Sequence, residues 1–118
     1  MTITGQNFEV YQGDNKTVIV TVRNQDGSLT NLTGYNAVWC AYRQTPDTIV
    51  ILKTTTSGIT IPDPLSGELH IDLGQTDTAA LTTSNYGHQC EIEDSFGNHA
   101  TVMAGYMRVL KSITHPEF

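Results

Sequence analysis

The chain has 118 residues, of which 12 are acidic and 6 are basic, so its net charge at neutral pH is −6. This length suits one domain over residues 1–118, and the acidic balance argues against nucleic acid and membrane surfaces as partners because it repels phosphates and anionic headgroups. No apolar run approaches the ~18 residues that span a bilayer, and the start of the chain does not resemble a signal peptide, so we expect synthesis and folding in a cytoplasm.

The first strands are predicted from short alternating runs that end in turn residues. Residues 8–11 alternate apolar and polar side chains and stop at the turn-forming residues 12–15. In residues 16–23, three valines at alternate positions share one face, so we expect that face to point inward. Residues 24–27 end this strand with Asp-Gly, which supplies the positive φ that a tight reversal needs.

Residues 29–43 hold the longest strand-like run and the only tryptophan, Trp39. A loop over residues 28–34 is predicted to attach to the core through Leu29 and Leu32. The strand that follows has two faces, which are Val38, Cys40 and Tyr42 on one side and Ala37, Trp39 and Ala41 on the other. Because a tryptophan on an inner strand is usually a core residue, we expect the Trp39 face in the core and this strand to serve both sheets.

Further strands follow a predicted break at residues 44–47. Residues 48–53 form a short apolar run, in which Ile49 and Ile51 oppose Val50 and Leu52, typical of a strand with both faces partly buried. Residues 58–61 are a brief strand, stopped by residues 62–64, whose two prolines predict an extended connection. Residues 66–73 alternate cleanly, with the inner face formed by Leu69, Ile71 and Leu73.

The last third of the chain begins with the only predicted helix, residues 75–81, capped by Thr76 or Asp77. Residues 86–94 place apolar side chains on one face and acidic ones on a solvent-facing side. Residues 95–98 are a hairpin turn, residues 99–110 the last long strand, and residues 111–118 an exposed tail. Seven or eight strands with one short helical turn predict an all-β fold, an immunoglobulin-like two-sheet antiparallel β-sandwich, with a Greek-key barrel as the alternative.

Metal binding would have to draw on a small set of side chains, which are His70, His88, His99, His115, Cys40 and Cys90. The one suggestive spacing is His88-x-Cys90 on one strand face, which Cys40 would join from a neighbouring strand. Ordinary packing of an apolar face explains this pair better, so we predict no metal and no cofactor. A disulfide between Cys40 and Cys90 is a better alternative than a metal site, but a cytoplasmic folding site favours reduced, buried thiols.

Acid–base chemistry would have to use Glu91, Glu93 and Asp94. Glu91 and Glu93 alternate with apolar neighbours, so a solvated strand face explains them better than a glycosidase pair. The sequence contains no nucleophile elbow, phosphate-binding loop or dinucleotide fingerprint. We therefore predict no catalytic residue and no enzyme activity.

A sugar-stacking platform is a different class of hypothesis, because aromatic rings can stack on carbohydrate. The candidate rings are Tyr11, Tyr35, Trp39, Tyr42, Tyr86, Phe96 and Tyr106. Most of them alternate with core positions, so packing is the better explanation.

The order of turn and strand signatures resembles a known group of proteins. The signatures are QGD at residues 12–14, a DG turn at 26–27, LTG at 32–34, SGELHIDL at 66–73, TDTAAL at 76–81 and DSFG at 94–97. Over nearly the whole chain they resemble the small immunoglobulin-like virion structural proteins of tailed bacteriophages, and are similar to the N-terminal domain of the baseplate upper protein family.

This resemblance implies a non-enzymatic virion part that docks on capsid, neck, tail or baseplate proteins, as a homo-oligomer. Baseplate members continue beyond this domain, whereas this chain stops at Phe118, so a capsid decoration or cement protein or a head-fibre base is expected first. A tail or baseplate adaptor, or a carbohydrate-binding adhesion module, is the alternative. Partner contacts are expected on loops and edges, at residues 12–15, residues 62–64 and the two termini.

Overall fold

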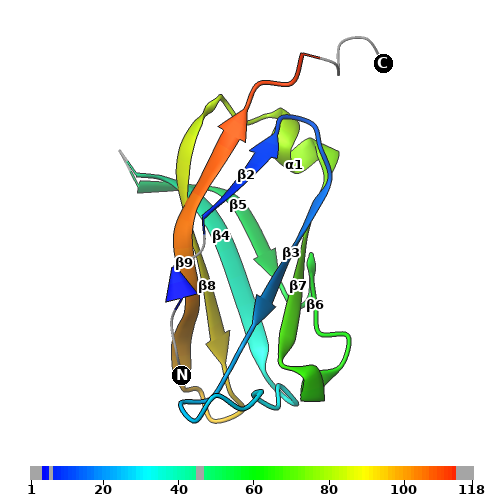
Figure 1. Cartoon of the computed structure of the whole chain (residues 1–118), viewed down its shortest axis with the longest axis vertical. Coiled ribbons are helices and arrows are strands. Elements are labelled where there is room, and N and C mark those ends of the chain that lie inside the picture. The colour runs from blue at the N-terminus through cyan, green and yellow to red at the C-terminus, as the bar shows by residue number, and fades with distance from the viewer. Residues whose placement is uncertain (1–3, 6, 45–46, 114–118) are drawn as a thin grey trace.

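A computed structural model describes residues 4–5, 7–44 and 47–113 of the chain. In this part of the chain the strands are β1 (Thr4–Gly5), β2 (Phe8–Tyr11), β3 (Lys16–Thr21), β4 (Asn36–Gln44), β5 (Asp47–Thr54), β6 (Ile59–Thr60), β7 (Glu68–Leu73), β8 (Ser84–Glu93) and β9 (His99–Leu110). A 3-10 turn, η1 (Pro64–Ser66), precedes β7, and a short helix, α1 (Gln75–Ala79), follows it (Figure 1). Neither helical element approaches the length and apolarity that crossing a membrane requires.

The strands form two sheets, as Figure 1 shows. The larger sheet has the order β1-β9-β8-β4-β5, with β2 also paired to β9, and the smaller sheet has the order β3-β7-β6. The predicted all-β, two-sheet sandwich is therefore confirmed. In immunoglobulin terms β3, β7 and β6 stand where strands B, E and D stand, and β4, β5, β8 and β9 stand for C, C′, F and G of the variable type.

One edge of the larger sheet departs from the antiparallel pattern. Strands β1 and β2 run parallel to β9, and Val10 lies opposite Val109. The chain passes from β2 through the turn at residues 12–15 into β3, which belongs to the other sheet. Because β2 and β3 do not form a hairpin, β2 pairs with the last strand of the chain.

The core lies between the two sheets, and the Trp39 face of β4 points into it, as expected. Trp39 and Ala41 have no exposed surface, whereas Val38 on the other face is exposed. The predicted inner faces of β3, β7 and β8 are also confirmed, since Val20, Leu69, Ile71, Leu73, Tyr86, Cys90 and Ile92 are buried. Strand β4 itself pairs only with β5 and β8, so it is central to the larger sheet and does not serve both.

A buried trio at the centre of the sandwich matches the immunoglobulin pattern with one replacement. The hydroxyl of Tyr86, near the start of β8, donates to the carbonyl of Thr82 and accepts from its amide, both at 3.1 Å, which is the geometry of a tyrosine corner. Two residues later, where antibody domains carry the second cysteine of their disulfide, stands His88. Trp39 Nε1 donates to His88 Nδ1 at 3.3 Å, which joins β4 and β8 within the larger sheet, whereas the antibody disulfide joins strands B and F of the two sheets.

The prediction for β5 was wrong in detail because of a β-bulge. Ala41 lies opposite Ile51 but Tyr42 lies opposite Ile49, so Val50 is an extra residue in the strand. The bulge reverses the alternation, and Ile49 and Leu52 are therefore both exposed on the outer face of the sheet.

Three local predictions were also wrong. Leu29 is exposed and only Leu32 anchors its loop, joined there by the buried Thr30. The connection after β6 is not wholly extended, because Asp63 caps the 3-10 turn η1. The cap of α1 is Gly74, and Asp77 in the first turn accepts a hydrogen bond from the Gly74 amide. Of the predicted break at residues 44–47, Gln44 ends β4 and Asp47 begins β5, and residues 45–46 lie outside the described residues. Residues 114–118 of the predicted tail at 111–118 also lie outside them.

Candidate functional site

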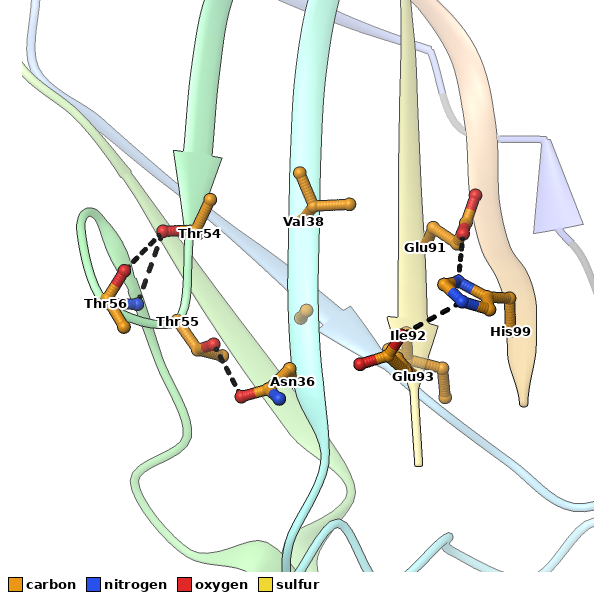
Figure 2. A pocket seen from close by; sticks show the side chains of 10 residues that line it. Asn36, Val38, Thr54, Thr55, Thr56, Glu91, Ile92, Glu93 and His99 are labelled. Atoms are coloured by element: carbon orange, nitrogen blue, oxygen red, sulfur yellow. Dashed lines mark hydrogen bonds and ion pairs between the residues drawn. The ribbon is translucent and has the colours of Figure 1, made fainter. Parts of the chain in front are cut away.

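A cleft of ≈ 400 Å³ opens on the outer face of the larger sheet. It lies where β4 and β9 begin and β5 and β8 end, and Figure 2 shows its two polar sides with Val38 between them. The sheet brings these strands together in the order β9-β8-β4-β5, so the cleft collects residues that are far apart in the sequence.

One side of the cleft carries all of its charge. His99 Nδ1 lies 2.7 Å from Glu91 Oε1, and His99 Nε2 lies 2.9 Å from Glu93 Oε2. The hairpin explains this arrangement, because the turn at residues 95–98 places Glu93 directly opposite His99 across β8 and β9. Glu91 lies opposite Thr101, two pairs further along the ladder, so it lies on the same face as Glu93 and His99.

The other side of the cleft is lined by hydroxyl and amide groups. Thr54 Oγ1 lies 2.9 Å from Thr56 Oγ1, and Thr55 Oγ1 donates to Asn36 Oδ1 at 3.3 Å. Cross-strand pairing positions these groups, since Asn36 lies opposite Glu93 and Val38 opposite Thr54. The two polar sides therefore flank an apolar floor.

The charged side chains of this cleft contact one another. Both nitrogens of His99 are occupied by the two carboxylates, and all three side chains are substantially exposed. Exposed ion pairs of this kind contribute at most about 1 kcal/mol to stability. A shallow depression with a charged side and a hydroxyl side is suited to contact a complementary surface.

An apolar patch adjoins the cleft on the same outer face. We call it the outer apolar patch, and its residues are Val38, Cys40, Tyr42, Ile49, Leu52 and Tyr106. Tyr42 lies opposite Ile49 on one side and opposite Gly87 on the other, and Gly87 lies opposite Tyr106. A Cβ at Gly87 would come within 2.4 Å of Tyr42 Cζ, so the Tyr42 ring covers this glycine and joins the two halves of the patch.

The residues considered for metal binding do not converge. His88 and Cys90 are buried on the inner face of β8, whereas Cys40, although on the neighbouring strand, is on the outer face of β4. His70 contacts Glu68 on the smaller sheet, at 3.1 Å, and His115 lies outside the described residues. Among the described residues no group of three or more histidine, cysteine or acidic side chains is arranged to hold a metal ion.

The two cysteines are free thiols, so the disulfide alternative is wrong. Residues Cys40 and Cys90 face opposite sides of the larger sheet, which explains why their sulfurs do not meet. Burial raises the pKa of the Cys90 thiol to about 12, with smaller contributions from Cys40 and Glu91. Burial also raises the pKa of Cys40. Neither thiol is an activated nucleophile.

The third candidate carboxylate, Asp94, has a structural role in the turn between β8 and β9. It accepts hydrogen bonds from the amides of Phe96 and Asn98 and from the side-chain amide of Asn98. The hydrogen bond from the Asn98 side chain, followed by that from its backbone, lowers the pKa of Asp94. Asp94 is therefore held apart from the Glu91–His99–Glu93 group, which the sequence patterns did not predict although the hairpin spacing contains the signal.

The seven aromatic candidates do not form one platform. Trp39 and Tyr86 are buried in the core, and Tyr35 and Tyr42 are half-buried. The exposed rings are those of Tyr11 on β2, Tyr106 on β9 and Phe96 in the turn before β9. This placement removes Trp39 from any sugar-stacking hypothesis.

The predicted loop sites lie at opposite ends of the sandwich (Figure 1). The turn at residues 12–15 is fixed to the region of α1, because Gln12 Nε2 donates to the Leu81 carbonyl and Thr78 Oγ1 donates to the Asp14 carbonyl. Residues 62–64 lead into η1, which carries the exposed Leu65. The outer face of the larger sheet was not among the predicted contact regions.

Comparisons with known proteins identify the fold. No protein-family model matches the chain, and no curated protein sequence matches it. Among solved structures, the N-terminal domain of phage TP901-1 ORF48 has a similar fold, with a TM-score of 0.59 and 11% sequence identity. The match covers 92% of this chain and 98% of that chain. The predicted resemblance to a phage domain is confirmed at the level of the fold.

Proposed function

We propose that this chain is a non-enzymatic structural domain of a bacteriophage virion, which attaches by docking on another virion protein. The observation that carries the proposal is the fold shared with a phage domain over 92% of this chain and 98% of the other. The interacting end of the domain is inferred from the loops. The loop between β3 and β4, the turn η1 and the turn between β8 and β9 lie at one end of the sandwich (Figure 1). Each of them carries an exposed apolar side chain, namely Leu29, Leu65 and Phe96.

Phe96 is the strongest candidate for an anchor because its side chain is 89% exposed while its backbone is fixed. The amides of Phe96 and Asn98 both donate to Asp94 Oδ1, which holds the turn in one conformation. The loops of Leu29 and Leu65 also support each other, since the Leu32 amide donates to the Pro64 carbonyl at 2.9 Å. Aromatic side chains presented on a rigid scaffold are typical anchors of protein interfaces.

The proposed position in the particle is the capsid, as a decoration or cement protein or as the base of a head fibre. A tail or baseplate adaptor is the alternative, and it uses the same kind of loop contact. Both positions place the protein in the virion after synthesis in the host. Cross-linking of purified particles followed by mass spectrometry distinguishes them, because residues near Phe96 would be joined to a capsid protein in one case and to a tail or baseplate protein in the other.

The test of the proposal is retention on the particle. We expect the wild-type protein to co-sediment with purified virions, and the pair of changes Leu65→Ser and Phe96→Ser to reduce retention at least about tenfold. Ile19→Ser on the smaller sheet is the matched control, because Ile19 is also an exposed apolar residue but lies on a strand face away from these loops. Absence of the wild-type protein from virions overturns the proposal, and equal retention of the double variant overturns the choice of loops.

A further inference from the structure

We infer that the outer apolar patch binds a second copy of this chain, face to face, as a symmetric dimer. The patch stands apart from the rest of the surface. Ile49, Leu52 and Tyr106 are each more than half exposed on one face, whereas the outer face of the smaller sheet has one such residue, Ile19. Contiguous apolar surface of this kind marks an interaction site.

The outer face of the larger sheet can be compared in area with a typical dimer interface. Strands lie about 4.8 Å apart and rise about 3.3 Å per residue, so four strands of the length of β4 present a flat outline of about 600 Å². The accessible area of side chains that project from that outline is larger, and a standard stable interface buries about 800 Å² per partner. Two such faces in contact over their whole area, polar ends included, therefore approach the size of a specific interface.

The distribution of charge favours one orientation of the second copy, because only one end of the face has an excess of negative charge and Arg108 offsets Glu9 at the other. Glu91, Glu93 and His99 lie at one end of the face, and Arg108 lies at the other end of β9, 3.9 Å from Glu9. The outer apolar patch between them has no charged side chain. A two-fold axis in the interface, running across the strands, places the Glu91 and Glu93 end of one copy over the Arg108 end of the other.

The opposite orientation is unfavourable. An axis along the strands would bring the Glu91 and Glu93 end of each copy towards the same end of the other, and like charges opposed across an interface are repulsive. With the axis across the strands, each copy contributes the same residues, as an isologous interface requires. Leu52 of one copy then lies against the same edge of the sheet in the other.

Sedimentation velocity of the purified full chain over a range of concentrations tests the dimer. We expect a concentration-dependent dimer with a dissociation constant of about 10 μM or tighter, weakened at least tenfold by Leu52→Lys. Ile19→Lys is the matched control. Ile19 is 54% exposed and Leu52 is 56% exposed, and each lies on an edge strand of its sheet. A wild-type chain that is monomeric at every concentration overturns the inference, as does equal loss of dimer with both variants.

The orientation has its own test by charge reversal. We expect Arg108→Glu to weaken the dimer several-fold and the combination of Arg108→Glu with Glu93→Lys to recover most of the loss. If adding Glu93→Lys to Arg108→Glu recovers no affinity, the orientation with the two-fold axis across the strands is wrong. A third readout is the rate at which a maleimide labels Cys40, which lies within the outer apolar patch. We expect this rate to fall at protein concentrations that favour the dimer. In the Leu52→Lys variant the rate should not depend on concentration.

This dimer is measured without virions, so its failure is separate from failure of the proposed function. The two proposals use different residues, Leu65 and Phe96 in one case and Leu52 in the other. Leu52→Lys is therefore also expected to leave the loop end intact.

Discussion

At the scale of single residues, the centre of the sandwich holds a histidine where antibody domains have a cysteine. Trp39 packs against His88 and donates to its Nδ1, and Phe8 lies on the same imidazole with its ring centroid 5.0 Å away. Because Nδ1 accepts, the ring proton of His88 belongs on Nε2. A disulfide would constrain the unfolded chain, whereas the contacts of this group stabilise only the folded state.

The tyrosine corner makes the first prediction. Tyr86→Phe removes a hydroxyl that both donates to and accepts from the Thr82 backbone. We expect it to lower the free energy of unfolding by about 1–3 kcal/mol, since a buried backbone group loses its partner. Urea denaturation measures the change, and Tyr106→Phe, at an exposed ring on the same sheet, should stay within about 0.5 kcal/mol of wild type. Equal effects of the two changes would contradict the structural role of the corner.

The thiols make the second prediction. Burial raises the pKa of Cys90 to about 12, so at about pH 8 almost none of it is thiolate and reagent access is blocked as well. We expect Ellman's reagent to react slowly with the half-buried Cys40 and not with Cys90 in the native protein. Both thiols should react in denaturant, as free cysteines must. Rapid reaction of both in the native state would mean that the core opens easily.

At the scale of elements, alternation in the sequence predicted most of the strands because one face of each is buried. Strand β7 is the clearest case, with Leu69, Ile71 and Leu73 all inside. Alternation does not predict bulges. The extra residue Val50 in β5 depends on how β5 pairs with β4, and the local sequence of β5 carries no signal of that pairing. The same non-local effect exposed Leu52, so the sequence did not reveal the outer apolar patch. The cleft escaped prediction for a related reason, since four strands contribute to it.

The third prediction concerns the contact between Gly67, which ends the turn η1, and the loop between β3 and β4. Gly67 has φ +70°, and a Cβ there would lie 2.8 Å from the Val22 carbonyl oxygen and 3.2 Å from that of Thr30. Gly27 also has a positive φ of +89°, but it has open space around it. We expect Gly27→Ala to cost about 1 kcal/mol for the backbone conformation alone and Gly67→Ala about 3 kcal/mol because crowding adds to it. Thermal unfolding of both variants compares them, and equal costs would contradict the close approach.

Helix α1 makes the fourth prediction, on pH. Asp77 accepts from the Gly74 amide at 2.7 Å and pairs with Lys53 at 2.8 Å. Burial acts to raise the pKa of Asp77, but the hydrogen bonds from Lys53 and Gly74 and the Lys53 charge outweigh it, so the pKa is lowered. Because the pKa of Asp77 is lower in the folded state than in the unfolded state, ionised Asp77 stabilises the fold at pH values above the unfolded-state pKa of about 3.9. This stabilisation is lost as the pH falls through the folded-state pKa.

Asp77→Asn isolates this charge because it keeps the shape and an acceptor oxygen. We expect it to lower the free energy of unfolding by about 1–2 kcal/mol at neutral pH. The difference from wild type should shrink as the pH falls below the unfolded value of about 3.9 and should disappear once the pH is below the lowered pKa of the folded state. Unfolding curves at several pH values measure this. A difference that is constant with pH would show that the ion pair with Lys53 does not contribute.

At the scale of the whole molecule, the two ends of the sequence are joined by one edge of the larger sheet. Strand β2 pairs in parallel with β9, with Phe8 opposite Met107 and Tyr11 opposite Leu110. Val10 is buried in the core, and Phe8 covers His88. A segment near the start of a chain is often dispensable, but this one closes the core and covers one edge of the last strand, which would otherwise be free to pair with another chain.

Removal of residues 1–11 should therefore destabilise the domain severely. Loss of the buried Val10 and of the Phe8 ring costs about 4 kcal/mol or more of buried apolar surface, a large part of the 5–15 kcal/mol by which domains are stable. Calorimetry or circular dichroism should show that the truncated chain is largely unfolded or aggregated at about 37 °C. Two point changes separate packing from truncation, since Val10→Ala should cost about 2 kcal/mol and the exposed Glu9→Ala should cost less than about 0.5 kcal/mol. A truncated chain as stable as the full one would mean that the two sheets hold together without the parallel strand.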